Sequence, residues 1–162
     1  MGKFKKLTLA TAISSAFVLT GCGGSSGGSS NDSNTGGTTA TETGIFVDAA
    51  VAGINYTTSP SGTSGQTNAL GEYNYEAGDT VVFSIGGIDL PAVEATGRIT
   101  PADMGSGATD WSSDQTVVNI LRLLQTLDSD GDASNGITIS DAVHTALQDM
   151  DLDPSLSEAD FE

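Results

Sequence analysis

The sequence predicts an α+β fold, in which a small β-sandwich-like region is followed by a two-helix segment with an acidic loop. Three observations support this. Apolar and polar residues alternate through much of residues 45–105, as expected for half-buried strands. Apolar residues then recur at helical spacing in "SSDQTVVNILRLLQTLD". The stretch "LDSDGDASNGI" follows that helix and carries aspartate at alternate positions.

In the β region, residues 45–105, the clearest strand signal is "TVVFSIGGIDL", which places Val81, Phe83 and Ile85 on one face. The two glycines after Ile85 predict a hairpin turn, since both can adopt positive φ. Residues 50–58 and the stretch "GEYNYEAGD" are also expected to be strands. The tyrosines of these two segments, Tyr56, Tyr73 and Tyr75, are expected in the core; a sugar-stacking surface is the alternative interpretation.

Three stretches, "FVDAAVAGINYT", "TNALGEYNY" and "AGDTVVF", together resemble the carboxypeptidase regulatory-like, prealbumin-type (Ig-like) β-sandwich. Thr67, Gly71, Tyr73 and Tyr75 match the family's second element. Asn68 replaces an aspartate of that element, and Asp79-Thr80 stands where the third element has an aromatic residue. The resemblance implies a structural or interaction module rather than a catalytic one.

In the helical region, residues 106–162, a first helix is predicted from a capping box of Ser112 and Gln115. Trp111 is expected to pack against its start. A second helix is predicted over residues 141–150, with Ser140 as its N-cap. The acidic run after Asp149 is expected to be a solvated terminal segment.

The acidic loop between these helices is the candidate metal site. In a strict EF-hand loop starting at Asp128, glycine belongs at position 6 and glutamate at position 12, but Ala133 and Ile139 stand there. An EF-hand-like loop expanded by two residues places Asn135 at the sharp turn and Asp141 at the last ligand position.

Three aspartates within five residues repel one another, and a hard cation surrounded by oxygen ligands would relieve that repulsion. The predicted cofactor is therefore calcium, and the predicted ligands are Asp128, Asp130, Asp132, Asn135 and Asp141. The alternative is a solvated acidic turn without metal.

Residues 1–21 have the features of a secretory signal peptide. Lys3, Lys5 and Lys6 precede an apolar run that is shorter than the roughly 20 residues of a membrane-spanning helix. "LTGC", residues 19–22, resembles the lipobox of bacterial lipoproteins, which implies cleavage before Cys22 and acylation of that cysteine. Gly23 stands where aspartate would retain many Gram-negative lipoproteins in the inner membrane, so the resemblance favours an outer-membrane anchor. An ordinary signal peptide with a chance cysteine is the alternative.

Residues 22–44 are expected to form the lipidated cysteine and a disordered tether. Seven of residues 23–44 are glycine and ten are serine or threonine, so there is little to bury. Cys22 is the only cysteine in the chain, which excludes an intramolecular disulfide and a CxxC motif.

The net charge of the mature chain excludes some classes of binding partner. After loss of the signal peptide, two arginines remain against 21 acidic residues, a net charge of −19. No basic patch is available for nucleic acid or for anionic headgroups. The acidity fits either solubility in a salty environment or partial neutralisation by divalent cations.

The lipobox together with "GEYNYEAGDTVVFSIG" and "NILRLLQTLDSDGDASNGI" also resembles the N-terminal part of uncharacterised lipoproteins from marine Gram-negative bacteria. Those proteins continue beyond this sequence, so truncation of a longer chain is an expectation.

We therefore expect a membrane-anchored surface or periplasmic module that is calcium-stabilised and not an enzyme. Its ligand, either a glycan or a protein, is not identified by the sequence. An N-terminal accessory module of a larger extracellular hydrolase or adhesin is one alternative, and a catalytic lipoprotein is another. His144, the only histidine, is read as a packing or surface residue, because triads and zinc sites need companions that are absent from the sequence.

Overall fold

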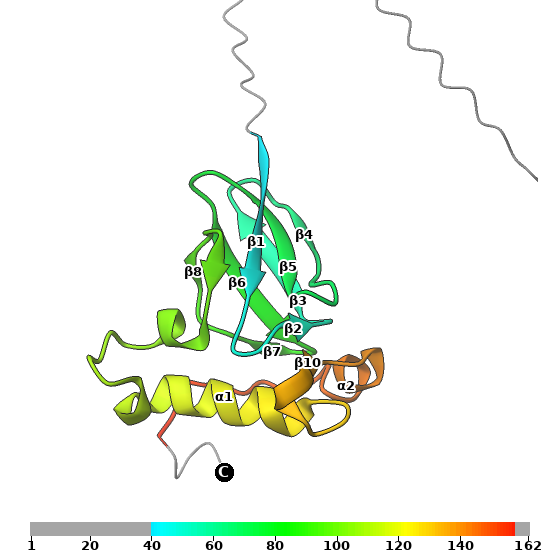
Figure 1. The fold of residues 1–162 in the computed structure, drawn as a ribbon, viewed down its shortest axis with the longest axis vertical. Helices are drawn as coiled ribbons and strands as arrows, with labels where there is room; N and C mark the ends of the chain where they lie inside the picture. The colour runs from blue at the N-terminus through cyan, green and yellow to red at the C-terminus, as the bar shows by residue number, and fades with distance from the viewer. Residues whose placement is uncertain (1–39, 158–162) are drawn as a thin grey trace, which may run out of the picture. The chain divides into compact units, whose positions relative to one another are not determined.

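Three small sheets and two α-helices form the part of the chain that the computed structural model describes, residues 40–157 (Figure 1). The α+β prediction is confirmed. The predicted signal peptide, Cys22 and most of the predicted tether lie outside the described residues, as do residues 158–162.

The first sheet has the order β5-β1-β9. Its strands are β1 (Thr41–Phe46), β5 (Glu72–Glu76) and β9 (Arg98–Ile99). β1 pairs antiparallel with β5 and parallel with β9. β1 begins inside the segment assigned to the tether, so the predicted boundary at residue 44 is wrong by four residues. Gly44 is buried beneath the ring of Tyr73, and a low-complexity composition does not reveal such a contact.

The second sheet has the order β4-β3-β6-β7, with β8 also paired to β6. Its strands are β3 (Asn55–Ser59), β4 (Ser64–Gln66), β6 (Thr80–Ile85), β7 (Ile88–Asp89) and β8 (Val93–Glu94). The predicted hairpin at Gly86-Gly87 joins β6 to β7. The predicted strand over residues 50–58 is interrupted at Gly53, whose φ is +76°, and its first part becomes β2 (Val51–Ala52).

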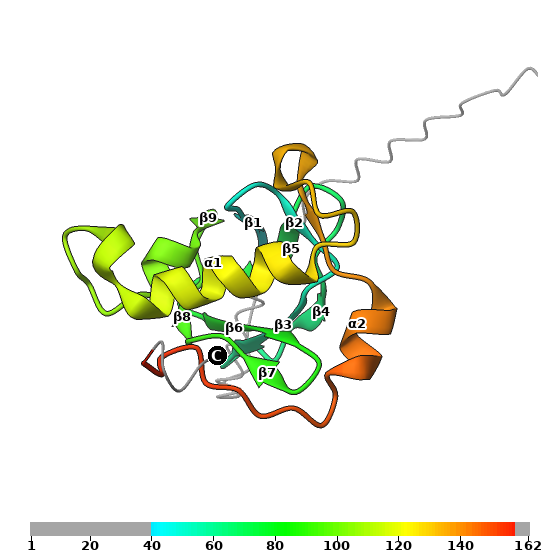
Figure 2. The same cartoon turned by 90° about the horizontal axis from the view of Figure 1, so that it is seen from below.

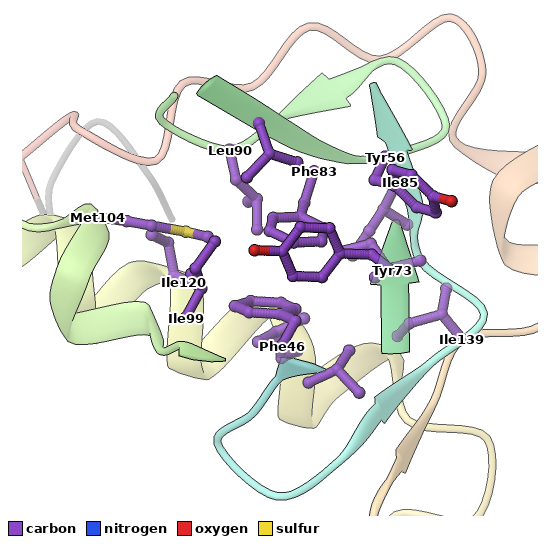
Figure 3. Packing of buried hydrophobic residues seen from close by; sticks show 14 of the residues in the cluster. Phe46, Tyr56, Tyr73, Phe83, Ile85, Leu90, Ile99, Met104, Ile120 and Ile139 are labelled. Atoms are coloured by element: carbon purple, nitrogen blue, oxygen red, sulfur yellow. The ribbon is translucent and has the colours of Figure 1, made fainter. Parts of the chain in front are cut away.

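Aromatic rings from the two larger sheets pack against one another in the core (Figure 3). Phe46 of β1 stacks on Phe83 of β6 with ring centroids 4.4 Å apart. Tyr73 of β5 lies edge-on to Phe83 and to Tyr56 of β3. Burial raises the pKa of Tyr73 to about 12. All three tyrosines are at most 6 % exposed, so the core interpretation is confirmed and the sugar-stacking alternative is wrong.

Helix α1 (Gln115–Leu127) crosses one end of the β layers (Figures 1 and 2). Its residues Ile120 and Leu124 are fully buried and belong to the same hydrophobic cluster as the aromatic rings. The two predicted regions therefore share one core. The short 3₁₀ helices η1 (Pro101–Met104) and η2 (Trp111–Ser113) lead into this helix.

The predicted capping box at the start of this helix is wrong. Asp114 is the N-cap, and its Oδ1 accepts hydrogen bonds from the N–H groups of Thr116 and Val117. Its Oδ2 accepts two more from Ser106, and these lower the pKa of the carboxyl. A buried carboxylate at the positive end of the helix is a better cap than the Ser112 hydroxyl.

Helix α2 (Asp141–Ala146) is shorter than predicted. Ser140 is its N-cap residue but makes no side-chain capping bond. The chain leaves the helix at Leu147, whose carbonyl accepts a hydrogen bond from the Gly87 N–H at 2.9 Å. A Cβ on Gly86 would lie 2.5 Å from the Leu147 backbone, so the glycine turn permits this close approach as well as the hairpin.

The segment after α2 is fixed to α1 by a buried asparagine. Asn119 is completely buried, and its Nδ2 donates to the carbonyls of Pro154 and Leu156 at 2.9 and 3.0 Å. Figure 2 shows this segment running past β7 and α1. The terminal run is therefore attached to the core in its middle, where Pro154 is buried. Its acidic side chains Asp149, Asp151 and Asp153 are exposed, as expected of a solvated segment.

Candidate functional site

The acidic loop is closed at its base by hydrogen bonds to β10 (Ile137–Thr138). Asp128, the residue after α1, accepts the Thr138 N–H at 2.9 Å through Oδ1. The N–H and hydroxyl of Ser129 both donate to the Thr138 carbonyl. β10 pairs in parallel with β2, and Ile137 is fully buried. The loop is thus held between α1 and the third sheet, order β10-β2.

Inside the loop, the polar side chains bond to one another and to the backbone. Asp130 accepts from the Asp132 N–H and from the Asn135 Nδ2, both at 2.9 Å. These bonds, led by that from Asn135, lower the pKa of Asp130. Asp132 caps the 3₁₀ turn η3 (Ala133–Asn135) by accepting from Ser134. The sharp turn falls at Gly131, with φ +70°.

Among the described residues, one solvent-shielded side-chain oxygen has no hydrogen-bond partner, and it lies in this loop. Oδ2 of Asp128 is shielded from solvent and makes no hydrogen bond to any described residue. A shielded carboxylate oxygen without a donor is costly, because it has lost hydration without replacement. It lies at the position where the loop meets α1, and a cation would satisfy it.

Asp141, the fifth predicted ligand, is engaged elsewhere. It is the first residue of α2, and its Oδ1 accepts from Gln66 of β4 at 3.4 Å. Hydrogen bonds therefore join Asp130 to Asp132 and Asn135 within the loop. Asp128 is bonded to Thr138 of β10, and Asp141 is directed to the second sheet. Among the described residues, no three aspartate, glutamate or histidine side chains gather as a ready metal site.

His144 joins α2 to the β layers. Its Nδ1 accepts the Gly86 N–H at 3.0 Å and lies 3.2 Å from the Asn55 amide, while its Nε2 lies 2.7 Å from the Gly53 carbonyl. A carbonyl only accepts and an N–H only donates, so the ring is the neutral tautomer with its proton on Nε2. No pattern in the sequence indicates this role, since the three partners are distant in the chain.

Comparison with known proteins assigns no family to the chain. No protein-family model matches it, and neither a curated protein nor a solved structure does. The resemblances noted in the sequence therefore stay predictions. Within residues 40–157, no helix has the length and apolar character needed to cross a bilayer.

Proposed function

We propose that the protein is a lipid-anchored module of the bacterial cell envelope, non-catalytic and stabilised by calcium. Acylated Cys22 would hold it at the membrane, with the outer membrane as the favoured site. The folded part would serve as a binding or structural unit on the end of the tether. We also propose that the two larger sheets form a prealbumin-type sandwich and that the acidic loop is an expanded EF-hand-like loop.

The unpartnered Oδ2 of Asp128 is the observation that carries the calcium proposal. It lies in a loop that already contains the oxygens of Asp130 and Asp132, and the lowered pKa of Asp130 keeps that carboxyl ionised. A calcium ion takes six to eight oxygen ligands in flexible geometry, so backbone carbonyls and water would complete the set. The ion would fix the loop between α1 and β10 and would do no chemistry.

His144 supports a non-catalytic role. Both nitrogens of the only histidine are bonded to the backbone of the glycine turns at Gly53 and Gly86. A general base needs a nitrogen free to face substrate. The contact of Phe46 with Phe83 across the two larger sheets supports the sandwich.

Calcium binding is tested by thermal and denaturant unfolding of the mature chain carrying Cys22→Ser. At 10 mM calcium and a dissociation constant of about 1 mM, mass action would stabilise the fold by about 1.4 kcal/mol. Asp130→Ala and the more conservative Asp128→Asn should each remove that response. Both substitutions change baseline stability, so the quantity compared is the difference between calcium and chelator.

Asp149→Ala is the matched control, because Asp149 is an exposed acid outside the loop. It should keep the full calcium response. Identical unfolding curves in calcium and chelator for the unsubstituted chain would contradict the calcium proposal.

The anchor is tested separately by expressing the full chain in a Gram-negative host. Mass spectrometry of the membrane fraction should find a diacylglyceryl group and a fatty amide on Cys22, and Cys22→Ser should release the protein from the membranes. Density-gradient separation then locates the anchored form. An unmodified Cys22 would overturn the lipoprotein proposal and leave the calcium proposal untouched.

A further inference from the structure

A cavity with an exposed indole lies at the open side of α1, away from the acidic loop. Its volume is about 190 Å³. Trp111 lines it and is 57 % exposed, so the predicted packing of this ring at the start of α1 leaves more than half of it in solvent. Val47, Pro101 and Leu121 supply apolar surface beside it. An exposed tryptophan beside apolar surface suits an amphipathic ligand, because the indole offers an apolar face and an N–H donor.

Two opposite charges line the same cavity without pairing. Arg98, in β9, and Asp48, in the turn after β1, both contribute to its wall. Neither side chain makes a hydrogen bond or ion pair within the described part of the chain. The guanidinium offers donors in a planar fork and the carboxylate offers acceptors. Both groups are therefore available to a bound molecule.

These features select a ligand by its chemistry. A pyranose ring has one apolar C–H face, which packs on an indole, and a rim of hydroxyls that both donate and accept. The charges of Arg98 and Asp48 cancel, and a mature chain of net charge −19 repels polyanions. A zwitterion would depend on ion pairs at an open rim, where such pairs contribute little. A neutral sugar uses the apolar floor, the indole and both polar groups.

We propose that this cavity binds a neutral pyranose ring of a glycan, with Trp111 as the stacking platform and Arg98 and Asp48 as hydroxyl partners. The inference rests on the binding role proposed above, for which it names the ligand. It does not rest on calcium or on the anchor. Its test is therefore run on the Cys22→Ser mature chain, in chelator and again in calcium.

Trp111 is the only tryptophan in the chain, so its fluorescence and its indole N–H resonance report this cavity alone. The chain is titrated with methyl glucoside, methyl galactoside, methyl mannoside and their β-linked oligomers. At least one neutral sugar should shift both signals and saturate in the millimolar range, as expected for a small ligand at a half-open site. The matched anionic probes are glucuronic and galacturonic acid, and the zwitterionic probe is phenylalanine.

The variants separate the cavity from the rest of the surface. By calorimetry, Trp111→Ala should weaken the best neutral sugar at least tenfold, and Trp111→Phe should retain part of the affinity. Arg98→Gln and Asp48→Asn should each weaken binding severalfold. Leu70→Ala, which removes another exposed apolar side chain, should leave it unchanged. Circular dichroism confirms folding of each variant.

Three results would overturn the inference. They are no shift of the indole signals by any neutral sugar, binding by uronic acids or phenylalanine alone, and full sugar affinity in Trp111→Ala. A calcium response without sugar binding would refute the sugar site and leave the calcium proposal standing. Sugar binding without a calcium response would refute the calcium proposal and leave the sugar site standing.

Discussion

The aromatic core and the acidic loop are built by opposite means. The rings of Phe46, Tyr73 and Phe83 come from three strands, and residues far apart in sequence must meet before any of their contacts exist. In the loop, every side-chain hydrogen bond made by Asp128, Asp130 and Asp132 joins residues at most ten positions apart. The core is buried and the loop is largely exposed.

Global stability is therefore expected to reside in the core, and local conformational change in the loop. A core of long-range contacts is lost only by global unfolding, whereas a local loop opens and closes at low cost. A ligand at the loop can then change local order without having to rebuild the fold. Substitutions in the two regions should therefore differ in size and in kind.

Phe83→Ala should give the largest effect, because the ring is fully buried between Phe46 and Tyr73. Truncating a buried phenylalanine costs about 3–5 kcal/mol of unfolding free energy. Ser134→Ala, in the loop, removes one short-range bond, from the Ser134 hydroxyl to Asp132, and should cost about 1 kcal/mol or less. Urea unfolding measures the loss of unfolding free energy in both variants. Equal losses would contradict the assignment of global stability to the core.

Gly44→Ala should come next, with a loss of about 2–3 kcal/mol from overpacking. An added Cβ would lie 2.3 Å from the Thr96 carbonyl oxygen and 2.6 Å from the Tyr73 ring. Gly97→Ala is the matched control, since its Cβ would meet nothing within 4 Å. If Gly44→Ala unfolds like the control, Gly44 belongs to the tether after all and the sheet begins later.

His144→Ala should cost about 2 kcal/mol, because it leaves the Gly86 N–H and the Gly53 carbonyl without their partner. Thr145→Ala, the neighbouring exposed position with one bond inside its own helix, should change stability by less than 1 kcal/mol. Nitrogen chemical shifts of the imidazole give a second measurement. A proton on Nδ1 in place of Nε2 would refute the arrangement.

The strands of the core could be predicted from the sequence because apolar and polar residues alternate in "GEYNYE" and "TVVFSI". This alternation follows which side chains are buried. The parallel pairings of β9 with β1 and of β10 with β2 could not, since these two-residue strands are formed by packing between distant segments. The same limit applies to His144 and Asn119, whose partners lie far away in the chain.

At the candidate site, spacing predicted that Asp130 and Asn135 belong to one loop, and their side chains hydrogen-bond at 2.9 Å. It placed the sharp turn at Asn135, whereas Gly131 has the positive φ within the acidic turn. Spacing could not predict that Asp141 turns to Gln66. The expanded-loop register treats the chain after Asn135 as part of one loop, whereas β10 fixes that chain to β2 and separates α2 from the acidic turn. Assigning ligand positions by residue spacing fails where part of the loop pairs with a distant strand.

Acid should lower the stability more through an aspartate of the β layers than through one of the loop, with little effect at neutral pH. Burial raises the pKa of Asp79 in the β part, but hydrogen bonds from Ser61 and from the Glu76 N–H outweigh it and lower the pKa to about 2. The carboxylate therefore stabilises the fold above its unfolded pKa of 3.8, and this contribution is lost as the pH falls from about 4 to 2. Unfolding free energies of Asp79→Asn should fall less steeply across that window than those of the unsubstituted chain.

Asp130→Asn, in the exposed loop, should change the pH dependence of the unfolding free energy less, since exposed charges interact weakly with the rest of the fold. The opposite ranking of the two slopes would place the acid-sensitive contacts in the loop and not in the β layers.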